Sequence, residues 1–291
     1  MGDSSDARIE RLYVDNFRCL VNFEIRLNEL TLLIGQNGVG KSSVLDVITA
    51  LHRLLGGVAK VNDGEIFSTK SLTKWQSSSV QVVEMEVFLP DVGDVEYRLE
   101  VEHDRASRRA RIALERLTAD GGPLFEFKSG EVQLYRDNHS EGPTFGSDWT
   151  ESALARVPER GDNRKLSRFL EFVRKIQVCR LYPPGFEAES RSEDPLLNLN
   201  GDNFSAWYRY VFQERQEFVP EYMEALRDVI DCFQSIRLAA VGEDARAFIV
   251  VFEDSSGRYE LKLDQLSDGQ RAILAVYGLI TMTANQGYTF F

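Results

Sequence analysis

The sequence predicts an α/β fold that is organised around a phosphate-binding loop and carries an antiparallel β region and a helical segment after that loop. Three observations predict it. Residues 35–42 fit the pattern G-x-x-x-x-G-K-[ST] without a mismatch, between a β-prone run and a helical pattern. Alternating apolar and polar residues dominate about 80–150. Residues 160–291 mix helical and strand patterns.

The bulk composition is that of a soluble globular protein of one large domain or two. The chain has 291 residues, 43% of them hydrophobic and 27% charged. Without an apolar run of 18 residues or a signal-peptide pattern, we expect no membrane segment and a cytoplasmic location. The net charge of −12 argues against a broadly basic nucleic-acid surface, but it allows a local basic groove.

The scattered cysteines and histidines do not suggest a disulfide framework or a metal site. Cys19, Cys179 and Cys232 lie far apart without C-x-x-C spacing, which favours reduced thiols. The three histidines are also isolated from one another.

Around the loop, the order of elements is the one that such a motif requires. Residues 9–14 and 23–27 read as strands, and the apolar run 30–34 reads as a short buried strand. After the loop, apolar residues recur at helical spacing and predict one buried helix face. That face comprises Val44, Val47, Ile48, Leu51, Leu54 and Leu55.

The loop residues have the chemistry that binding a polyphosphate requires. Glycines let the backbone turn its N–H groups toward phosphate oxygens, and the following helix adds the positive end of its dipole. Lys41 would reach the β- and γ-phosphates, and the Ser42 hydroxyl would be a ligand of Mg²⁺. The alternative is a chance glycine-rich turn. The candidate nucleotide-binding residues are Gly35, Asn37, Gly38, Gly40, Lys41, Ser42 and Ser43.

The region 80–150 reads as antiparallel strands that are joined by polar turns. Strands are expected at 83–89, 95–101 and 111–117, and residues 120–123 form a turn signal. Glu84 and Glu86 could be paired catalytic carboxylates, but two residues apart on one strand they fit a solvated face better.

The remainder reads as helices followed by strands and a last helix. Helices are expected at 166–173, 204–212 and 222–233, and strands at 236–241, 248–252 and 259–263. The last helix begins near Asp268 and ends at Gly287, and an apolar strand follows at 288–291. Its predicted buried face comprises Ala272, Ile273, Val276, Leu279 and Ile280.

From these patterns we expect three segments. Residues 1–150 form a β-rich lobe with the phosphate loop, 151–235 a helical insertion, and 236–291 a second lobe.

A second motif, Leu266-Ser267-Asp268-Gly269-Gln270-Arg271, precedes the last helix. By itself it could be an ordinary N-cap. Together with the phosphate loop it resembles the L-S-x-G-Q signature of ABC-type ATPases. The resemblance implies ATP and Mg²⁺ as cofactors and a head-to-tail homodimer or higher oligomer. In that arrangement Ser267, Gly269 and Gln270 of one copy would approach the γ-phosphate held by the other copy, at a helix N-terminus.

The opening of the chain is similar to that of RecF, SMC and OLD-type ATPases. Tyr13-Val14-Asp15-Asn16-Phe17-Arg18 precedes the glycine loop, and these proteins typically start with a strand, an Asn-Phe-Arg segment, two strands and such a loop. The resemblance implies an ABC-type P-loop NTPase head, with Arg18 near the nucleotide phosphates. The segment 199–204 resembles compact prokaryotic members with roles in DNA repair or phage defence. An SMC-like rod is not expected, because no long coiled coil separates the motifs.

Two features of the family are not assigned to residues of this chain, the acidic pair and the Q-loop glutamine. The acidic Asp-Glu pair, which would hold Mg²⁺ and polarise water, is expected directly after the strand at 288–291, so we expect that the chain is truncated before it. Catalytic residues for ATP hydrolysis are therefore not assigned. Gln76 and Gln81 are both candidates for the Q-loop glutamine.

Two partners are conceivable. One basic run lies at 105–111 and another at 160–175, and either could follow a DNA backbone or form a solvated surface. Alternatively, the head is a nucleotide-gated scaffold that regulates an effector protein, such as a nuclease or toxin, without binding DNA. A transporter subunit fits less well, because the two motifs are too far apart.

Overall fold

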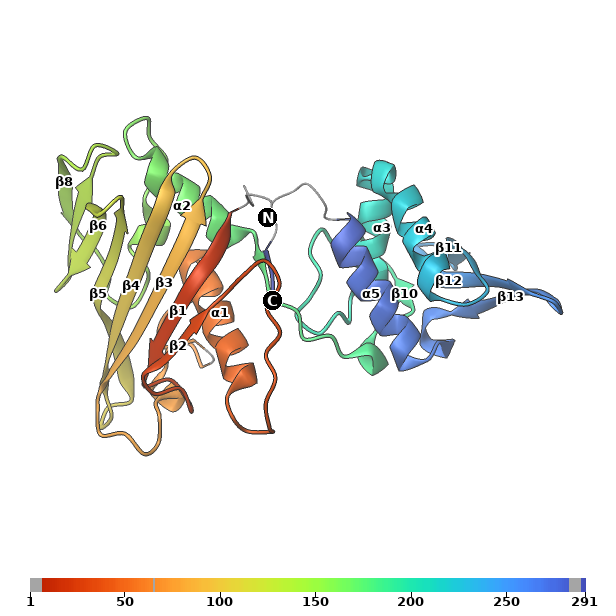
Figure 1. Ribbon diagram of the computed structural model, residues 1–291, viewed down its shortest axis with the longest axis horizontal. Helices are drawn as coiled ribbons and strands as arrows, with labels where there is room; N and C mark the ends of the chain where they lie inside the picture. The colour runs from red at the N-terminus through yellow and green to blue at the C-terminus, as the bar shows by residue number, and fades with distance from the viewer. Residues whose placement is uncertain (1–6, 65, 283–288) are drawn as a thin grey trace. The chain divides into compact units, whose positions relative to one another are not determined.

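The computed structural model describes residues 7–64, 66–282 and 289–291 (Figure 1). The chain divides into two compact units, Met1–Ile176 with Phe291, and Gln177–Phe290. The segment 151–235, which the sequence suggested as one helical insertion, contributes one α-helix to the first unit and two to the second.

The first unit is built on an eight-stranded antiparallel sheet with the strand order β2-β1-β3-β4-β5-β6-β7-β8. Consecutive strands from β3 to β8 are neighbours, as expected where short turns join antiparallel strands. The strands predicted at 9–14, 23–27, 83–89, 95–101 and 111–117 are all present. The bounds are β1 (Arg8–Asp15), β2 (Phe23–Arg26), β3 (Val80–Leu89), β4 (Gly93–Asp104), β5 (Arg109–Ala119), β6 (Gly122–Lys128), β7 (Glu131–Tyr135) and β8 (Glu141–Gly146).

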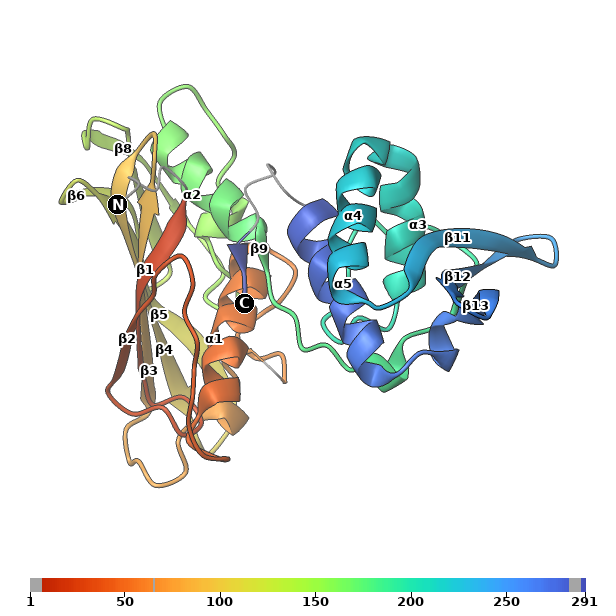
Figure 2. The same ribbon diagram turned by 45° about the vertical axis from the view of Figure 1, so that its right-hand side comes forward.

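Two helices, α1 (Lys41–Leu55) and α2 (Arg164–Arg174), cover one face of this sheet (Figure 2). All six residues of the predicted α1 face are buried. The rings of Tyr97 on β4 and Phe169 on α2 stack with their centroids 5.7 Å apart, which ties α2 to the sheet. The imidazole Nδ1 of His52 lies 2.9 Å from the carbonyl oxygen of Val173, which joins the two helices. Short 3₁₀ turns, η1 (Thr69–Ser71) and η2 (Leu154–Arg156), complete this layer.

The opposite face of the sheet carries charged side chains in cross-strand ion pairs. Arg11 on β1 lies 3.1 Å from Glu84 and 3.0 Å from Glu86 on β3, and Arg98 on β4 also pairs with Glu84. Opposite charges on neighbouring strands stabilise a sheet face. Glu84 and Glu86 therefore belong to a half-exposed charged face, as the two-residue spacing indicated.

The predicted strand at 30–34 is contradicted. This segment is assigned to no strand, and Leu30, Leu32 and Ile34 are 91%, 78% and 84% exposed. A strand needs a neighbour to satisfy its backbone N–H and C=O groups, and no described strand pairs with this segment. The run is apolar, as its sequence shows, but apolar composition does not determine whether another strand pairs with it.

The second unit packs helices on a smaller antiparallel sheet. In that sheet β12 pairs with β10, β11 and β13. The strands are β10 (Glu189–Ser190), β11 (Phe233–Val241), β12 (Ala245–Asp254) and β13 (Gly257–Lys262). The helices are α3 (Phe204–Glu214), α4 (Val219–Val229) and α5 (Asp268–Met282), with the short turns η3 (Pro183–Gly185), η4 (Gln216–Phe218) and η5 (Leu263–Gln265). The two-residue strands β9 (Ile176–Gln177) and β14 (Thr289–Phe290) complete the assignment.

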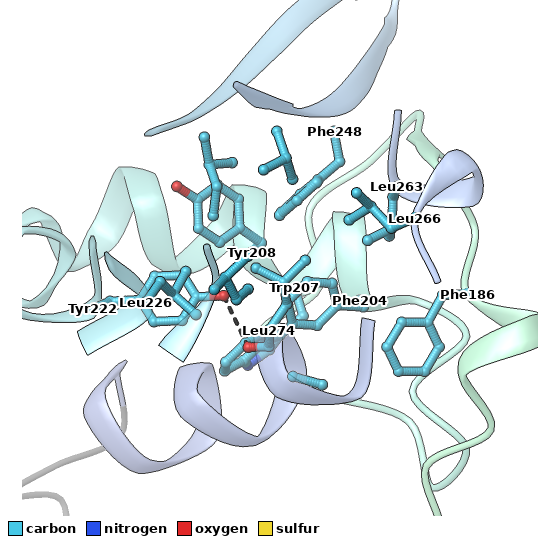
Figure 3. Packing of buried hydrophobic residues seen from close by; sticks show 14 of the residues in the cluster. Phe186, Phe204, Trp207, Tyr208, Tyr222, Leu226, Phe248, Leu263, Leu266 and Leu274 are labelled. Carbon is cyan, nitrogen blue, oxygen red and sulfur yellow. Dashed lines mark hydrogen bonds between the residues drawn. The ribbon is translucent and has the colours of Figure 1, made fainter. Parts of the chain in front are cut away.

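Aromatic side chains fill the core of the second unit (Figure 3). Tyr208 on α3 contacts Phe248 on β12 edge to face, with centroids 4.9 Å apart. The Tyr222 hydroxyl on α4 donates a hydrogen bond of 2.8 Å to the backbone oxygen of Leu274 on α5. Burial of this phenol raises its pKa well above the ordinary value. The contacts hold all three helices around one aromatic cluster.

The predicted helix at 222–233 is wrong at its end. The helix ends at Val229, and β11 begins at Phe233. Cys232 has a φ of +62°, a left-handed conformation that turns the chain between helix and strand.

The predicted buried face of the last helix is also partly wrong. Leu279 is buried, but Val276 is 42% and Ile280 61% exposed, while Leu274 and Ala275 face the core. Because apolar residues surround most of this helix, their spacing could not select the buried side. Its predicted end at Gly287 lies outside the described residues, and so does Tyr288, whereas β14 confirms part of the strand predicted at 288–291.

One buried carboxylate attaches the segment after the sheet to β5. Glu115 is fully buried, and its carboxylate accepts hydrogen bonds from the Tyr97 hydroxyl (3.1 Å), the Ser152 hydroxyl (2.5 Å) and the backbone N–H groups of Ala153 (3.1 Å) and Leu154 (3.4 Å). Burial raises the pKa of Glu115, and the hydrogen bonds oppose that shift.

We predict that Glu115→Ala lowers the free energy of unfolding by about 2–4 kcal/mol. The substitution leaves four buried donors without their acceptor and opens a cavity. Urea unfolding measures the loss. Glu126→Ala, at a half-exposed position on β6, is the matched control and should change stability by less than about 0.5 kcal/mol. Equal losses in the two variants would contradict the anchoring role.

Candidate functional site

The glycine loop 35–42 runs directly into the N-terminus of α1. Gly38 and Gly40 have φ angles of +86° and +106°, which a residue with a Cβ adopts only at a cost. Gly40 is the N-cap residue, and no side chain caps the helix. The first N–H groups of an α-helix have no partner within the helix and carry partial positive charge. The loop therefore presents backbone donors suited to an anion.

Lys41 lies within the same loop. Its ammonium group donates hydrogen bonds to the backbone oxygens of Gly35 (2.6 Å) and Gln36 (2.7 Å). An ammonium group has three donors on a flexible stem, so it can exchange carbonyl oxygens for phosphate oxygens. The lysine is thus placed at the loop that the motif assigns to it.

The two serines after Lys41 have different surroundings. Ser42 is exposed in the first turn of α1, which suits a hydroxyl that would contact a metal ion, whereas Ser43 is buried. The Ser43 Oγ lies 3.4 Å from the Cys19 Sγ. Ser43 therefore contacts the loop that follows β1. Asn37, by contrast, is exposed.

The loop after β1 packs against the start of α1. Arg18 forms an ion pair with Asp46 in the second turn of that helix. A Cβ placed on Gly40 would lie 3.0 Å from the Cys19 Sγ and 3.1 Å from a Leu20 methyl carbon. The structure therefore brings Arg18 to the helix that follows the phosphate loop. The sequence did not indicate Asp46 or Cys19, because no motif spacing links them to the loop.

Buried polar side chains hold this loop in a left-handed turn. Asn16 and Arg18 have φ angles of +63° and +52°. The Asn16 amide donates to the backbone oxygens of Ser78 (3.0 Å) and Val80 (2.9 Å), and the Gln81 amide donates to the Asn16 oxygen (2.9 Å). The turn is thus fixed from β3.

The same network includes a buried histidine. The His103 Nε2 lies 2.8 Å from the Gln81 Oε1, and burial, with the nearby Arg105 charge, lowers the pKa of His103 to about 4. Gln81 is 1% exposed, and both its amide nitrogen and its amide oxygen take part in these hydrogen bonds. Of the two Q-loop candidates, only Gln76 is partly exposed.

The second motif begins α5 in the other unit. The Ser267 hydroxyl accepts a hydrogen bond from the Gln270 N–H (3.3 Å), and the Gln270 side-chain oxygen accepts one from the Ser267 N–H (3.0 Å). This reciprocal pair is a capping box. Gly269 is exposed, and a Cβ built there would meet nothing within 4 Å. Ser267 and Gln270 thus cap α5, and Gly269 leaves its first turn open.

Arg271 connects that helix to η3. Its guanidinium donates to the backbone oxygen of Pro183 (2.7 Å) and pairs with Asp268 (2.9 Å). The motif is therefore held in place by its last residue as well as by the buried Leu266.

The described ranges contain neither a cluster of metal-ligating side chains nor a membrane-spanning helix. No group of three or more histidine, cysteine or acidic side chains could hold a metal ion there. None of the helices there combines the length and the hydropathy needed to cross a bilayer.

Comparison with known proteins supports the interpretation of residues 35–42 as the phosphate-binding loop of an ATPase. Residues 8–89 match the model of the AAA ATPase domain family AAA_15. The ribose import ATP-binding protein RbsA of Jannaschia sp. (strain CCS1) is 35% identical over 71 residues, which are 24% of this chain and 14% of that relative. The match thus spans a small part of the relative's length. Over residues 8–89 the expected P-loop ATPase domain is confirmed, and the short match to RbsA agrees with its ABC type.

Two solved structures show a weak overall likeness. One, from work on ATP-driven dimerisation and DNA-stimulated activation of SMC ATPases, has a TM-score of 0.29 and 20% identity, covering 38% of this chain and 69% of that one. The other, the recombination mediator RecF with ATP from the RecFOR pathway, has a TM-score of 0.39 and 11% identity, covering 99% and 85%.

We predict that Gly40→Ala destabilises the first unit more than Gly38→Ala does. Both positions have positive φ, so each substitution costs about 1–2 kcal/mol of backbone strain. Only at Gly40 would the new methyl group also press on Cys19 and Leu20. Urea unfolding of the two variants isolates that contact, and equal losses would show that the loop after β1 does not support the phosphate loop.

Proposed function

We propose that this chain, which carries an ABC-type P-loop ATPase head, binds ATP with Mg²⁺ and closes with a second copy around the bound nucleotide. One observation carries the proposal: the loop 35–42 presents left-handed glycines and Lys41 at the uncapped N-terminus of α1.

Each loop residue would contribute one kind of contact. The backbone N–H groups of Gly35, Asn37, Gly38 and Gly40 would surround the phosphates, and Lys41 would neutralise the terminal ones. The exposed Ser42 hydroxyl would bind Mg²⁺, which supplies further charge neutralisation when bound. Ser43 and Arg18 would support the site from α1 and from the loop after β1.

Closure with a second copy rests on the N-terminus of α5. The first turn of α5, with Ser267, Gln270 and the exposed Gly269, would be a second anion-binding end and would complete a nucleotide site on the partner copy. A head-to-tail homodimer with two such shared sites follows.

A contact with DNA is the second part of the proposal. The two basic runs differ in how many of their side chains form ion pairs. On α2, Lys165 pairs with Asp120 (2.7 Å) and Arg168 with Asp91 (2.7 Å), which neutralises two of the four basic side chains of this helix. At the β4–β5 turn, neither Arg108 nor Arg109 forms a salt bridge in the described part of the chain. The DNA repair or defence role that the resemblance implies would depend on this second region. The alternative, a scaffold for an effector protein, requires no DNA affinity.

We predict that Lys41→Ala weakens MgATP binding by about ten- to a hundred-fold, because a charge-assisted hydrogen bond contributes about 1.5–3 kcal/mol. Isothermal titration calorimetry measures the affinity. Lys74→Ala, at an exposed lysine of the same unit, is the control and should bind like the parent chain. Unchanged affinity of Lys41→Ala would remove the nucleotide assignment.

We predict that Ser267→Asp binds MgATP normally as a monomer but no longer dimerises with itself. Aspartate retains the helix cap, but its carboxylate repels the phosphates of the partner copy. A mixture of Ser267→Asp with Lys41→Ala should recover a heterodimer with one intact site, as light scattering with chromatography would detect. If Ser267→Asp dimerises like the parent chain, the shared site is disproved.

A further inference from the structure

A groove of about 890 Å³ lies at the β4–β5 turn of the first unit, and its walls include Asn62, Arg108, Arg109, Arg111 and Trp149. Its volume falls in the range of pockets that hold a small organic ligand. None of these residues belongs to the phosphate loop or to the signature motif.

The end of β5 explains how this groove forms. β6 pairs with β5 only from Leu114 onward, so residues 109–112 have a free edge on that side. Asn62 occupies part of that edge, because its side chain exchanges hydrogen bonds with the Ala110 N–H (2.7 Å) and C=O (2.9 Å). The Trp149 backbone oxygen accepts the Ile112 N–H (2.7 Å). The indole is therefore placed beside the turn by backbone contacts.

The tryptophan offers a partly open aromatic surface. Trp149 is 49% exposed, and the Arg111 guanidinium lies 5.8 Å from its ring centroid. Arg111 also donates to Glu102 at 2.9 and 2.7 Å, so this side chain is fixed between a carboxylate and the ring. An ordered, half-exposed indole is suited to stack on a planar group.

The acidic side chains around the ring make their hydrogen bonds with partners other than Arg108 and Arg109. Glu102 is paired with Arg111. Asp104 accepts the Ala106 N–H (2.9 Å), the Ser107 N–H (3.2 Å) and the Ser107 hydroxyl (2.6 Å) within the turn. Arg108 and Arg109 are exposed and form no salt bridge in the ranges that the structure describes. The groove lining thus contains three arginines against two carboxylates, a local positive excess in a chain of net charge −12.

We propose that this groove binds a single-stranded nucleic acid, with a base stacked on Trp149 and backbone phosphates on Arg108 and Arg109. Stacking needs an unpaired base, because the faces of paired bases are covered in a duplex. This proposal narrows the DNA contact suggested above to a single strand. It therefore rests on the DNA part of the proposed function.

The experiment measures binding of a labelled oligodeoxythymidylate and of a duplex of equal length by fluorescence anisotropy. We predict that Trp149→Ala weakens binding of the single strand by about ten-fold or more, and that Trp149→Phe, which keeps a stacking ring, restores most of it. Trp75→Ala is the control, because Trp75 is a more exposed tryptophan of the same unit that does not line the groove. Unfolding curves check that the variants fold.

The salt dependence tests the phosphate contacts separately. Replacing Arg108 and Arg109 by serine should lower the slope of log affinity against log salt by about 1.4, because each phosphate contact on a single strand contributes about 0.7. Arg164→Ser with Arg174→Ser on α2 is the matched control and should leave the slope unchanged.

The groove proposal would be overturned if Trp149→Ala bound the single strand as tightly as the parent chain does. It would also be overturned if removal of the two arginines left the slope of log affinity against log salt unchanged. A third contradicting result would be equally tight binding of polyglutamate that Trp149→Ala does not weaken. Duplex binding that persists in the groove variants would leave the general DNA proposal in place. Absence of all nucleic-acid binding in a chain that still binds MgATP would remove the DNA contact and leave the nucleotide site.

Discussion

The packing of α1 on the eight-stranded sheet is the constraint on which the phosphate loop depends. A 15-residue helix is marginal in isolation, so its start is defined by tertiary contacts. Its six large apolar residues are all buried, which contributes roughly 9–18 kcal/mol as an upper estimate. Because the sheet holds the helix, the glycine turn before Lys41 has a fixed end from which to present its N–H groups.

The chain uses the same physical device at two helix starts, with different caps. At α1 the cap is Gly40, so backbone geometry alone shapes the end where an anion would bind. At α5 the cap is the reciprocal pair of Ser267 and Gln270, with Gly269 left open beside it.

Charged side chains are paired to different degrees on different surfaces of the first unit. The outer face of the sheet carries arginines and glutamates in cross-strand pairs, and α2 carries Lys165 and Arg168 in ion pairs. Such pairs add little stability each, but they neutralise the local field. At the β4–β5 turn Arg111 pairs with Glu102, Asp104 accepts hydrogen bonds within the turn, and Arg108 and Arg109 line the groove with Trp149.

Local patterns predicted much of the fold. Period-two alternation located the strands β1 to β5, helical spacing located α1 and its buried face, and the glycine motif located the loop at its start. These features depend on neighbours in sequence. The spacing of glycines, lysine and serine also identified the candidate nucleotide site, because the backbone of that loop builds it.

What the sequence could not determine depends on residues far apart in the chain. The run at 30–34 looks like a strand, but no described strand pairs with it, and strand formation requires a partner. The buried side of α5 was set by the aromatic cluster and not by periodicity. The pairing of Arg18 with Asp46, the anchoring of the Asn16 turn by Gln81, and the position of Trp149 beside Arg111 are decided only by tertiary structure, since each joins side chains from separate elements.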